Sequence, residues 1–520
     1  MVAVWNNKEL LSWYLIALTL QKKVQAGAPT SESRPEPSSL GIEGEKDGVE
    51  KLDEEIIGKS ETREEEWVIT IREKLAQAHD EEVRSLWEKV SIYRVPKSLR
   101  EGDEKAFMPQ VVSIGPYHHN RPRLRDMERH KWRALSHTLT RTTQDVTRYL
   151  DAAREMEERT RQCYAAHISL SPDAFVEMMV LDGCFALEVM RGAIDGFHQL
   201  GYSRDDPVFA MRGVIHALQR DMIMLENQLP LFVFDRFLGI QTSNPDESAS
   251  ATQLALCFFD PIRPNDEPFL QKESNRFRNM DPPTQLGLFD PLGDEGLHFL
   301  HVFRRSLLLT YPNPPSRHRL HVKHPPPVRA TDKRRQQLIH CVTELRAAGI
   351  KLRKRKTDRF WDVRFSRGVL QIPRLLIHDG TKSLFLNLMA FEQCHLECGS
   401  EITSYIIFMD NLINSPEDVR YLHYRRIIEH WLGNDEEVAE LFNNLCREIV
   451  FDMKDSYLSR LSEEVNKYYD HKWNTWGATL RQNYFNNPWA IISFFAALVL
   501  LILTFTQTFY SVLAYYRPPS

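Results

Sequence analysis

The chain has 520 residues, which is enough for two to four ordinary domains or one large helical domain. Its composition is that of a folded protein, with 42% hydrophobic and 26% charged residues, and its formal net charge is -5. Residues 41–66 alone contain eleven acidic and four basic side chains, so the rest of the chain is close to neutral. A near-neutral surface lacks the dense basic face that a phosphate backbone requires, which argues against a nucleic-acid partner.

Residues 1–25 form an N-terminal hydrophobic segment. Leu10–Leu20 has the length of the apolar region of a secretory signal, and Ala26–Ala28 resembles a small-residue cleavage site. However, the residues before Leu10 carry no net positive charge, and Lys22 and Lys23 follow the apolar stretch. A cleaved signal and a peripheral helix therefore both stay open. The first would place the bulk of the protein in the lumen or outside the cell, and the second in the cytosol.

Residues 26–66 are rich in Ser, Pro, Gly and Glu, a composition that predicts a disordered acidic tether. We expect a helical domain over residues 67–480. Its first helix is indicated by Val83, Leu86, Trp87 and Val90, which follow the spacing of one helical face and stop before Pro96.

The middle of the chain alternates between helical patterns and breaks. A short extended stretch at residues 110–114 ends in a turn at Gly115-Pro116, and residues 125–195 and 207–238 have the apolar periodicity of helices. Residues 241–335 are interrupted by many prolines, which predicts a variable insertion with one helix around Leu297–Leu309.

The last third shows clear helix-capping signals. Ser415 and Pro416 begin one helix, which Gly433 is expected to close, and Asn434 caps the next. Only Gly368–Ile377 is typical of a strand, and its proline at position 373 restricts it to an edge or a turn. The predicted fold class is therefore mainly α, a large multi-helix globular domain with minor β, plus one C-terminal transmembrane helix.

The transmembrane helix is predicted over residues 489–516, within a stretch without charged side chains. It is long enough to cross a bilayer core of about 30 Å with some tilt. Aromatic residues at its two ends suit the headgroup regions. The residues that mark the span are Trp489, Ile491, Phe494, Leu500, Phe505, Tyr510 and Tyr516. We expect a single-pass C-terminal anchor with membrane lipid as its partner.

Seven cysteines lie mostly inside apolar helical patterns. An odd number without regular loop spacing is typical of buried free thiols rather than of a disulfide framework. This usage favours a cytosolic location for the bulk of the protein, on the plasma membrane.

The common catalytic signatures are missing. The chain has no Gly-x-Ser-x-Gly, His-Glu-x-x-His or Gly-x-Gly-x-x-Gly motif. Cys394, His395 and Cys398 are too few for structural zinc, which takes four ligands, so buried thiols on a helix are the better interpretation. We predict no catalytic residue, no cofactor and no metal ligand.

Three carboxylates interrupt apolar runs: Asp182, Glu226 and Glu392. An unpaired charge is costly in such surroundings. One interpretation is that they pair with Lys131, Arg374 or backbone amides inside a helical core. The other is that they serve as acid and base with raised pKa values.

The main basic cluster runs from Lys351 to Lys356 and contains Lys351, Arg353, Lys354, Arg355 and Lys356. A solvated loop is one interpretation. Contact with anionic lipid or an acidic partner is the other, since each basic residue near such a membrane contributes about 1 kcal/mol.

Several longer motifs resemble one family. They are Ser91–Pro96, Pro109–His118, Met127-Glu128 with His130-Lys131, Met179–Phe185, Asp221–Pro230, Leu386–Gln393, Ile402–Asn411 and Asn487–Ser493. Together they resemble the plant domain of unknown function 247 over roughly residues 67–516. The resemblance implies a single-pass plant membrane protein with no established activity, ligand set or cofactor. It also implies that some grass members are associated with self-incompatibility loci.

These observations lead to a functional hypothesis. We expect a membrane-anchored protein that acts through recognition or signalling, by contact with an unknown protein partner, and that is not an enzyme. The alternative is an enzyme of undescribed type that uses Asp182, Glu226 and Glu392.

Overall fold

The structure is a computed structural model. It describes residues 67–72, 74–75, 90–211, 213–242, 250–264, 298–308, 328–329, 338–357, 359–395, 397–452, 456–470 and 488–516. The hydrophobic segment 1–25, the tether 26–66 and most of the predicted helical stripe from Val83 to Val90 lie outside these residues. The chain divides into two compact units, residues 1–85 and 86–520. Of the first unit, residues 67–72 and 74–75 are described, and they are helical.

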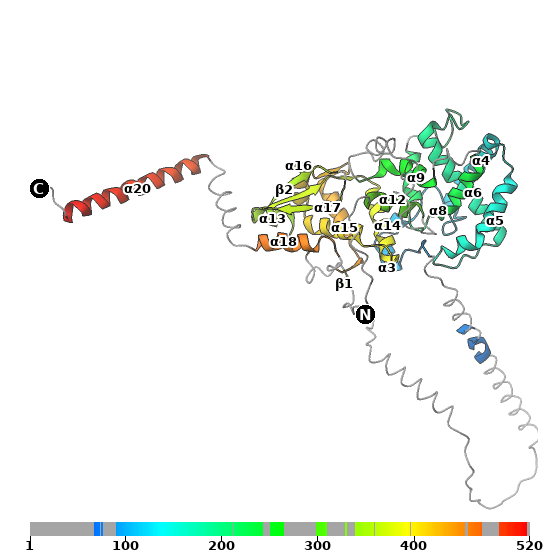
Figure 1. Ribbon diagram of the computed structural model, residues 1–520, viewed down its shortest axis with the longest axis horizontal. Coiled ribbons are helices and arrows are strands. Elements are labelled where there is room, and N and C mark those ends of the chain that lie inside the picture. The colour runs from blue at the N-terminus through cyan, green and yellow to red at the C-terminus, as the bar shows by residue number, and fades with distance from the viewer. Residues whose placement is uncertain are drawn as a thin grey trace, which may run out of the picture. The chain divides into compact units, whose positions relative to one another are not determined.

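The first half of the larger unit is helical (Figure 1). Its α-helices are α3 (Lys97–Gly102), α4 (Arg125–Thr142), α5 (Val146–Gln162), α6 (Pro172–Arg191), α7 (Val214–Met222), α8 (Leu231–Gln241), α9 (Ala251–Phe259) and α12 (Phe299–Leu308). Shorter helical turns are η2 (Glu104–Phe107), η3 (Pro122–Leu124), η4 (Gly192–Gly196) and η6 (Asp260–Ile262).

Helix α6 is the centre of this half. Ser171 caps its N-terminus by accepting a hydrogen bond from the amide of Ala174, and Pro172 occupies the first turn. Every residue from Met178 to Met190 is buried, because α4, α5, α8 and α9 all pack against α6. A helix that is apolar on all sides is stable only inside such a cage of neighbours.

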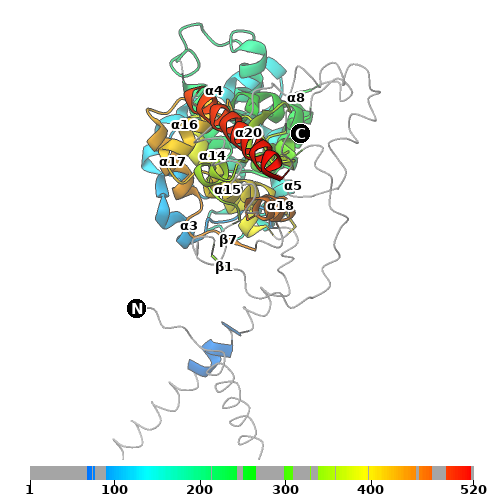
Figure 2. The same ribbon diagram turned by 90° about the vertical axis from the view of Figure 1, so that its left-hand side faces the viewer.

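The second half contains α13 (Val342–Ala347), α14 (Thr381–Cys394), α15 (Glu401–Leu412), α16 (Pro416–Tyr424), α17 (Asp435–Leu445) and α18 (Ser459–Tyr469). Figure 2 shows α14, α15, α16 and α17 side by side. Helix α14 also packs against η2 of the first half. One hydrophobic core therefore runs through both halves.

The strands are short. They are β1 (Val328–Arg329), β2 (Lys351–Arg355), β3 (Arg364–Ser366), β4 (Val369–Pro373), β5 (Leu375–Ile377), β6 (Ile428–His430) and β7 (Val450–Phe451). They form a three-stranded sheet in the order β2-β4-β3 and two-stranded pairs β5-β6 and β1-β7. Strands β2 and β4 are parallel, and β3 is antiparallel to β4. The prediction of a mainly α fold with minor β is confirmed.

Two predictions about this sheet are wrong. The basic cluster at Lys351 is not a loop, because its first five residues form β2 with Leu352 fully buried. Strand β4 is not at an edge, because it lies between β2 and β3. Pro373 is tolerated there because it is the last residue of β4, where a missing amide donor costs least.

The two predicted helix starts near the C-terminus are confirmed, and one predicted end is wrong. Ser415 caps α16 in a capping box, and Asn434 caps α17. However, α16 ends at Tyr424, well before Gly433. Arg426 takes the left-handed conformation (φ 57°) that glycine usually supplies after a helix. Strand β6 then separates α16 from α17.

The proline-rich region 241–335 contains the predicted helix, which is α12, and a second helix, α9, that the sequence analysis missed. Phe259 of α9 contacts the rings of Phe299 and Phe303 on α12, with centroids 5.9 and 6.2 Å apart. Residues 243–249, 265–297, 309–327 and 330–337 lie outside the described residues.

Helix α20 (Pro488–Tyr516) is the predicted transmembrane segment. Among the described residues it contains one stretch long and apolar enough to cross a bilayer, Ile492–Leu513, and none of that stretch is buried. Leu500 and Phe505, for example, are 63% and 73% exposed. An unburied apolar face of this size is characteristic of a membrane or a protein contact.

Candidate functional site

Asp182 of α6 is joined to two of the family-like motifs. Its Oδ1 lies 2.6 Å from the ammonium nitrogen of Lys131 on α4, and its Oδ2 accepts a hydrogen bond from the amide of Gly115. Lys131 also donates to Glu128 and to the hydroxyl of Ser113, so its three N–H groups each have an acceptor. Burial raises the pKa of the Asp182 carboxyl, and Lys131 opposes that shift.

Glu226 lies between α7 and α8 and binds the segment around α3. Its carboxylate accepts hydrogen bonds from the amide of Val95 at 2.7 Å and from the guanidinium groups of Arg94 and Arg100. The ring of His118, also fully buried, lies 3.5 Å from the same carboxylate. This site therefore holds α3 and the residues before it against the 223–230 loop.

Glu392, near the end of α14, caps α15. Helix α15 has no cap from its own N-terminal residue. Instead, the Glu392 carboxylate accepts hydrogen bonds from the amides of Ile402 and Thr403 and from the Thr403 hydroxyl. Arg304 of α12 donates to the same carboxylate with N–O distances of 2.7 and 2.9 Å. Burial raises the pKa of Glu392, and the Arg304 charge opposes that shift.

The three carboxylates have separate functions in the fold. Among the described residues, their sets of partners have no member in common. Each side chain is at most 1% exposed. Of the two predicted cation partners, Lys131 binds Asp182, while Arg374 pairs with Glu429. A general acid or base must reach a substrate proton, and these sealed ion pairs offer no such path.

Three further polar residues, which the sequence analysis did not single out, also bind the backbone of distant segments. Oδ2 of Asp221 accepts hydrogen bonds from three successive amides, at residues 110–112. Asn227 bonds the amide of Ile114 and the carbonyl of Val112. Asn387 of α14 bonds the amide of Leu225 and the carbonyl of Ala106. A signal was available for Asn387, which interrupts the apolar run from Leu384 to Phe391, but not for Asp221 and Asn227, which have polar neighbours.

Together these contacts tie the family-like motifs to one another. Within the described part of the chain, the extended stretch 110–115 has no strand partner, and buried backbone amides need an acceptor. Side chains of Asp221, Asn227 and Asp182 supply it. The motif residues thus explain how the fold is held together.

The basic strand β2 lies at one edge of its sheet. Lys351, Arg353, Lys354 and Lys356 are exposed. Arg355 is partly buried and forms an ion pair with Asp362 at 2.7 Å. Four basic side chains are therefore exposed on this edge strand and the residue after it, while Arg355 is engaged within the sheet.

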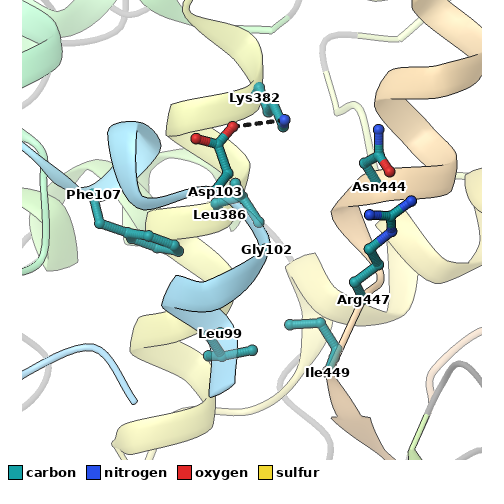
Figure 3. Close-up of a pocket in the computed structure, with 9 residues that line it drawn as sticks. All are labelled: Leu99, Gly102, Asp103, Phe107, Lys382, Leu386, Asn444, Arg447 and Ile449. Carbon is teal, nitrogen blue, oxygen red and sulfur yellow. Dashed lines mark ion pairs between the residues drawn. The ribbon is translucent and has the colours of Figure 1, made fainter. Parts of the chain in front are cut away.

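A small pocket lies where α3, α14 and the end of α17 meet (Figure 3). Figure 3 shows Lys382 pointing to Asp103, with which it forms an ion pair of 2.6 Å, and Asn444 and Arg447 on the opposite side. The space inside is about 10 Å³, room for about one water molecule. This pocket is too small for an organic substrate.

None of the seven cysteines forms a disulfide, and Cys163, Cys184 and Cys446 are buried, as predicted, whereas the other four are partly exposed. Cys394 and Cys398 flank His395, whose Nδ1 lies 3.0 Å from the hydroxyl of Tyr93 and whose ring stacks on Phe391. Burial raises the pKa of the Cys394 thiol to about 11, which disfavours the thiolate that metal binding and nucleophilic chemistry require.

Comparison with known proteins gives a family. Residues 92–503 match DUF247, described as a plant protein of unknown function. The UPF0481 protein At3g47200 of Arabidopsis thaliana is 32% identical over 447 residues, which cover 82% of this chain and 87% of that protein. The putative UPF0481 protein At3g02645 of the same plant is 26% identical over 518 residues, covering 85% and 94%. No solved structure matches.

Proposed function

This chain belongs to the DUF247 family of plant proteins of unknown function, and we propose that it is a membrane-anchored protein that acts through protein–protein recognition rather than catalysis. One observation carries the proposal: the buried carboxylates Asp182, Glu226 and Glu392 are all bound by cations and amides of the fold itself. The alternative, an enzyme that uses these carboxylates as acid and base, would need at least one of them free and accessible.

The surface around β6 is the best candidate for partner contact. Tyr424, the last residue of α16, is 79% exposed, and Trp431, directly after β6, is 73% exposed. The backbone of Trp431 is fixed by a hydrogen bond from its amide to the carbonyl of Ile377. Large aromatic side chains on a rigid backbone are the residues that most often dominate protein interfaces.

This proposal is tested with the full-length chain in plant membranes, cross-linked and purified. We expect a reproducible protein partner whose recovery falls at least tenfold in Trp431→Ala. The matched control is Trp132→Ala, which removes another half-exposed tryptophan, on α4. If both variants recover the same proteins as the wild type, this recognition surface is wrong. A turnover of small molecules that Glu226→Gln abolishes without unfolding would favour the enzyme alternative.

We propose that α20 anchors the protein in the plasma membrane with its bulk in the cytosol. The absence of charge from Ile492–Leu513 and its exposed apolar side chains support the anchor. Free thiols at all seven cysteines support a reducing compartment. Protease protection on sealed membranes tests this, with one tag at the N-terminus and one near residue 250. If the internal tag is protected from protease added on the cytosolic side, the bulk of the protein lies on the opposite side of the membrane, and the proposed orientation is wrong.

A second contact, between β2 and anionic lipid, follows from the chain connection. Strand β3 packs against α18, where the rings of Phe365 and Tyr468 lie 5.7 Å apart. Only residues 470–487 connect α18 to α20. An extended chain spans at most about 3.5 Å per residue, so these residues keep the sheet that contains β2 within about 60 Å of the bilayer and allow it to reach the lipid surface. Its exposed lysines and arginine would then meet lipid headgroups.

A further inference from the structure

We propose that His423, His430 and Asp435 form a binding site for a divalent transition metal, Zn²⁺ in the first place. The three side chains come from different elements: the C-terminal turn of α16, the end of β6 and the first residue of α17. One ligand atom from each lies within 4.8 Å of the others. Two imidazoles and one carboxylate are the donor set of many zinc sites that keep a fourth position for water.

The distances fit a metal with little rearrangement. Nε2 of His430 and Oδ1 of Asp435 are 3.1 Å apart. Zinc–ligand bonds of about 2.0–2.1 Å place neighbouring donors of a tetrahedral site about 3.3 Å apart, so this pair already has the required spacing. The ring centroids of His423 and His430 are 5.2 Å apart. His423 is exposed, and a rotation of its side chain brings its nitrogen to the same point.

The burial of His430 distinguishes this cluster of three side chains from an ordinary contact at the protein surface. Its side chain is only 8% exposed, and among the described residues its Nδ1 has no hydrogen-bond partner. Nδ1 can therefore carry the ring proton, which leaves the lone pair of Nε2, 3.1 Å from Asp435, available to a metal. Coordination through Nε2 would bind a buried imidazole and the Asp435 carboxylate to the same ion.

The surrounding helices hold the ligands in place. The capping box at Ser415 fixes the start of α16, and Asn434 fixes the start of α17 by accepting from the amide of Glu437. The two helices pack against each other, and α16 packs against β6. A metal would therefore cross-link the chain between residues 423 and 435.

One charge opposes the metal. Arg420 lies 3.4 Å from Oδ2 of Asp435, but its side chain is 72% exposed. Exposed ion pairs contribute little, so Arg420 can move away or remain on Oδ2 while Oδ1 binds the metal. The N-terminus of α17 also carries positive partial charge, which the acidic residues of its first turn, Asp435, Glu436 and Glu437, offset.

The test is metal binding by the full-length chain in detergent, purified without a histidine tag and stripped with a chelator. Calorimetric titration with Zn²⁺ is expected to show one site per chain, while Mg²⁺, which prefers oxygen ligands, should not compete. His423→Gln and His430→Gln should each weaken binding by more than tenfold, since even partners of metal ligands contribute about 10–100-fold. Because His423 is exposed, its variant should keep the fold.

His340→Gln is the matched control, because Nδ1 of His340 also lies 3.1 Å from a carboxylate, that of Glu344. Co²⁺ provides an independent readout: its visible spectrum should show nitrogen and oxygen ligands without a thiolate charge-transfer band. If the wild type binds no Zn²⁺, or if His423→Gln and His430→Gln bind it as the wild type does, the proposal is wrong. A thiolate band would assign the bound metal to cysteines instead and would equally overturn it.

Discussion

Lys131 of α4 and Asp182 of α6 form an ion pair inside the helical core, with 2.6 Å between Nζ and Oδ1 and neither side chain more than 1% exposed. Because the same aspartate accepts from the amide of Gly115, this pair joins three motifs that lie far apart in the sequence. Its members depend on each other, since either charge alone would be buried without compensation.

The Lys131→Met variant should lose about 3–5 kcal/mol of unfolding free energy, because it leaves the Asp182 charge unpaired in the core. Adding Asp182→Asn should restore much of that loss, since the amide oxygen still accepts from Gly115 and the carboxylate that has lost Lys131, that of Glu128, is 20% exposed to solvent. Urea unfolding of the full-length chain in detergent, followed by tryptophan fluorescence, measures both. A double variant no more stable than Lys131→Met would show that the charge is not the cause.

The Gly115→Ala variant should be destabilised by more than about 2 kcal/mol. Gly115 has a φ of +79°, and a Cβ added there would lie 2.3 Å from the carbonyl oxygen of Gln228. Gly102→Ala is the control, because a Cβ at Gly102, in helix α3, meets nothing within 4 Å. That change should be neutral or gain up to about 1 kcal/mol. Equal midpoints for the two variants in thermal unfolding would contradict this account of Gly115.

The helices could be predicted because their signals are local. Ser415-Pro416 and Asn434 begin helices by bonding amides within three residues, which the sequence displays directly. Helix α9 was missed because prolines dominate its surroundings, although Ser250 and Gln253 form a capping box. Strand β2 was missed because one buried residue, Leu352, among basic neighbours gives almost no periodicity.

The polar contacts could be predicted in kind but not in detail. An apolar run around Asp182 requires a buried partner, and Lys131 was one of the cations considered. The partner of Glu392 could not be found in this way, because Arg304 lies 88 residues earlier in a proline-rich region. The cluster of His423, His430 and Asp435 was missed because it forms only when β6 separates α16 from α17.

The variant Lys351→Glu/Arg353→Glu should lose contact with anionic membranes. Each basic residue near such a surface contributes about 1 kcal/mol, and reversal replaces attraction with repulsion. Hydrogen exchange of residues 351–356 is measured for the full-length chain in nanodiscs with and without phosphatidylserine. We expect extra protection in the anionic discs for the wild type only. The control variant Arg148→Glu/Arg154→Glu reverses two exposed charges on α5 and should keep that extra protection. If the control variant also loses it, the net charge of the protein, and not strand β2, causes the contact with anionic lipid.

Acid should destabilise the body of the protein through its buried histidines. Burial lowers the pKa of His298 to about 3, although its contact with the Ser91 carbonyl opposes the shift. Burial, followed by nearby arginines, lowers the pKa of His118 to about 3 as well.

Between about pH 6.5 and 3 the unfolded chain binds protons at these two histidines and the folded chain does not, so stability is full above pH 6.5 and falls as pH decreases. Each histidine contributes about 1.4 kcal/mol per pH unit. Since the unfolded histidine is already half protonated at pH 6.5, urea unfolding at pH 6.5 and 5.5 should show a loss that is about 1 kcal/mol smaller in His298→Gln, while the exposed control His198→Gln behaves as the wild type. An equal loss in all three proteins would mean that His298 is protonated in the fold.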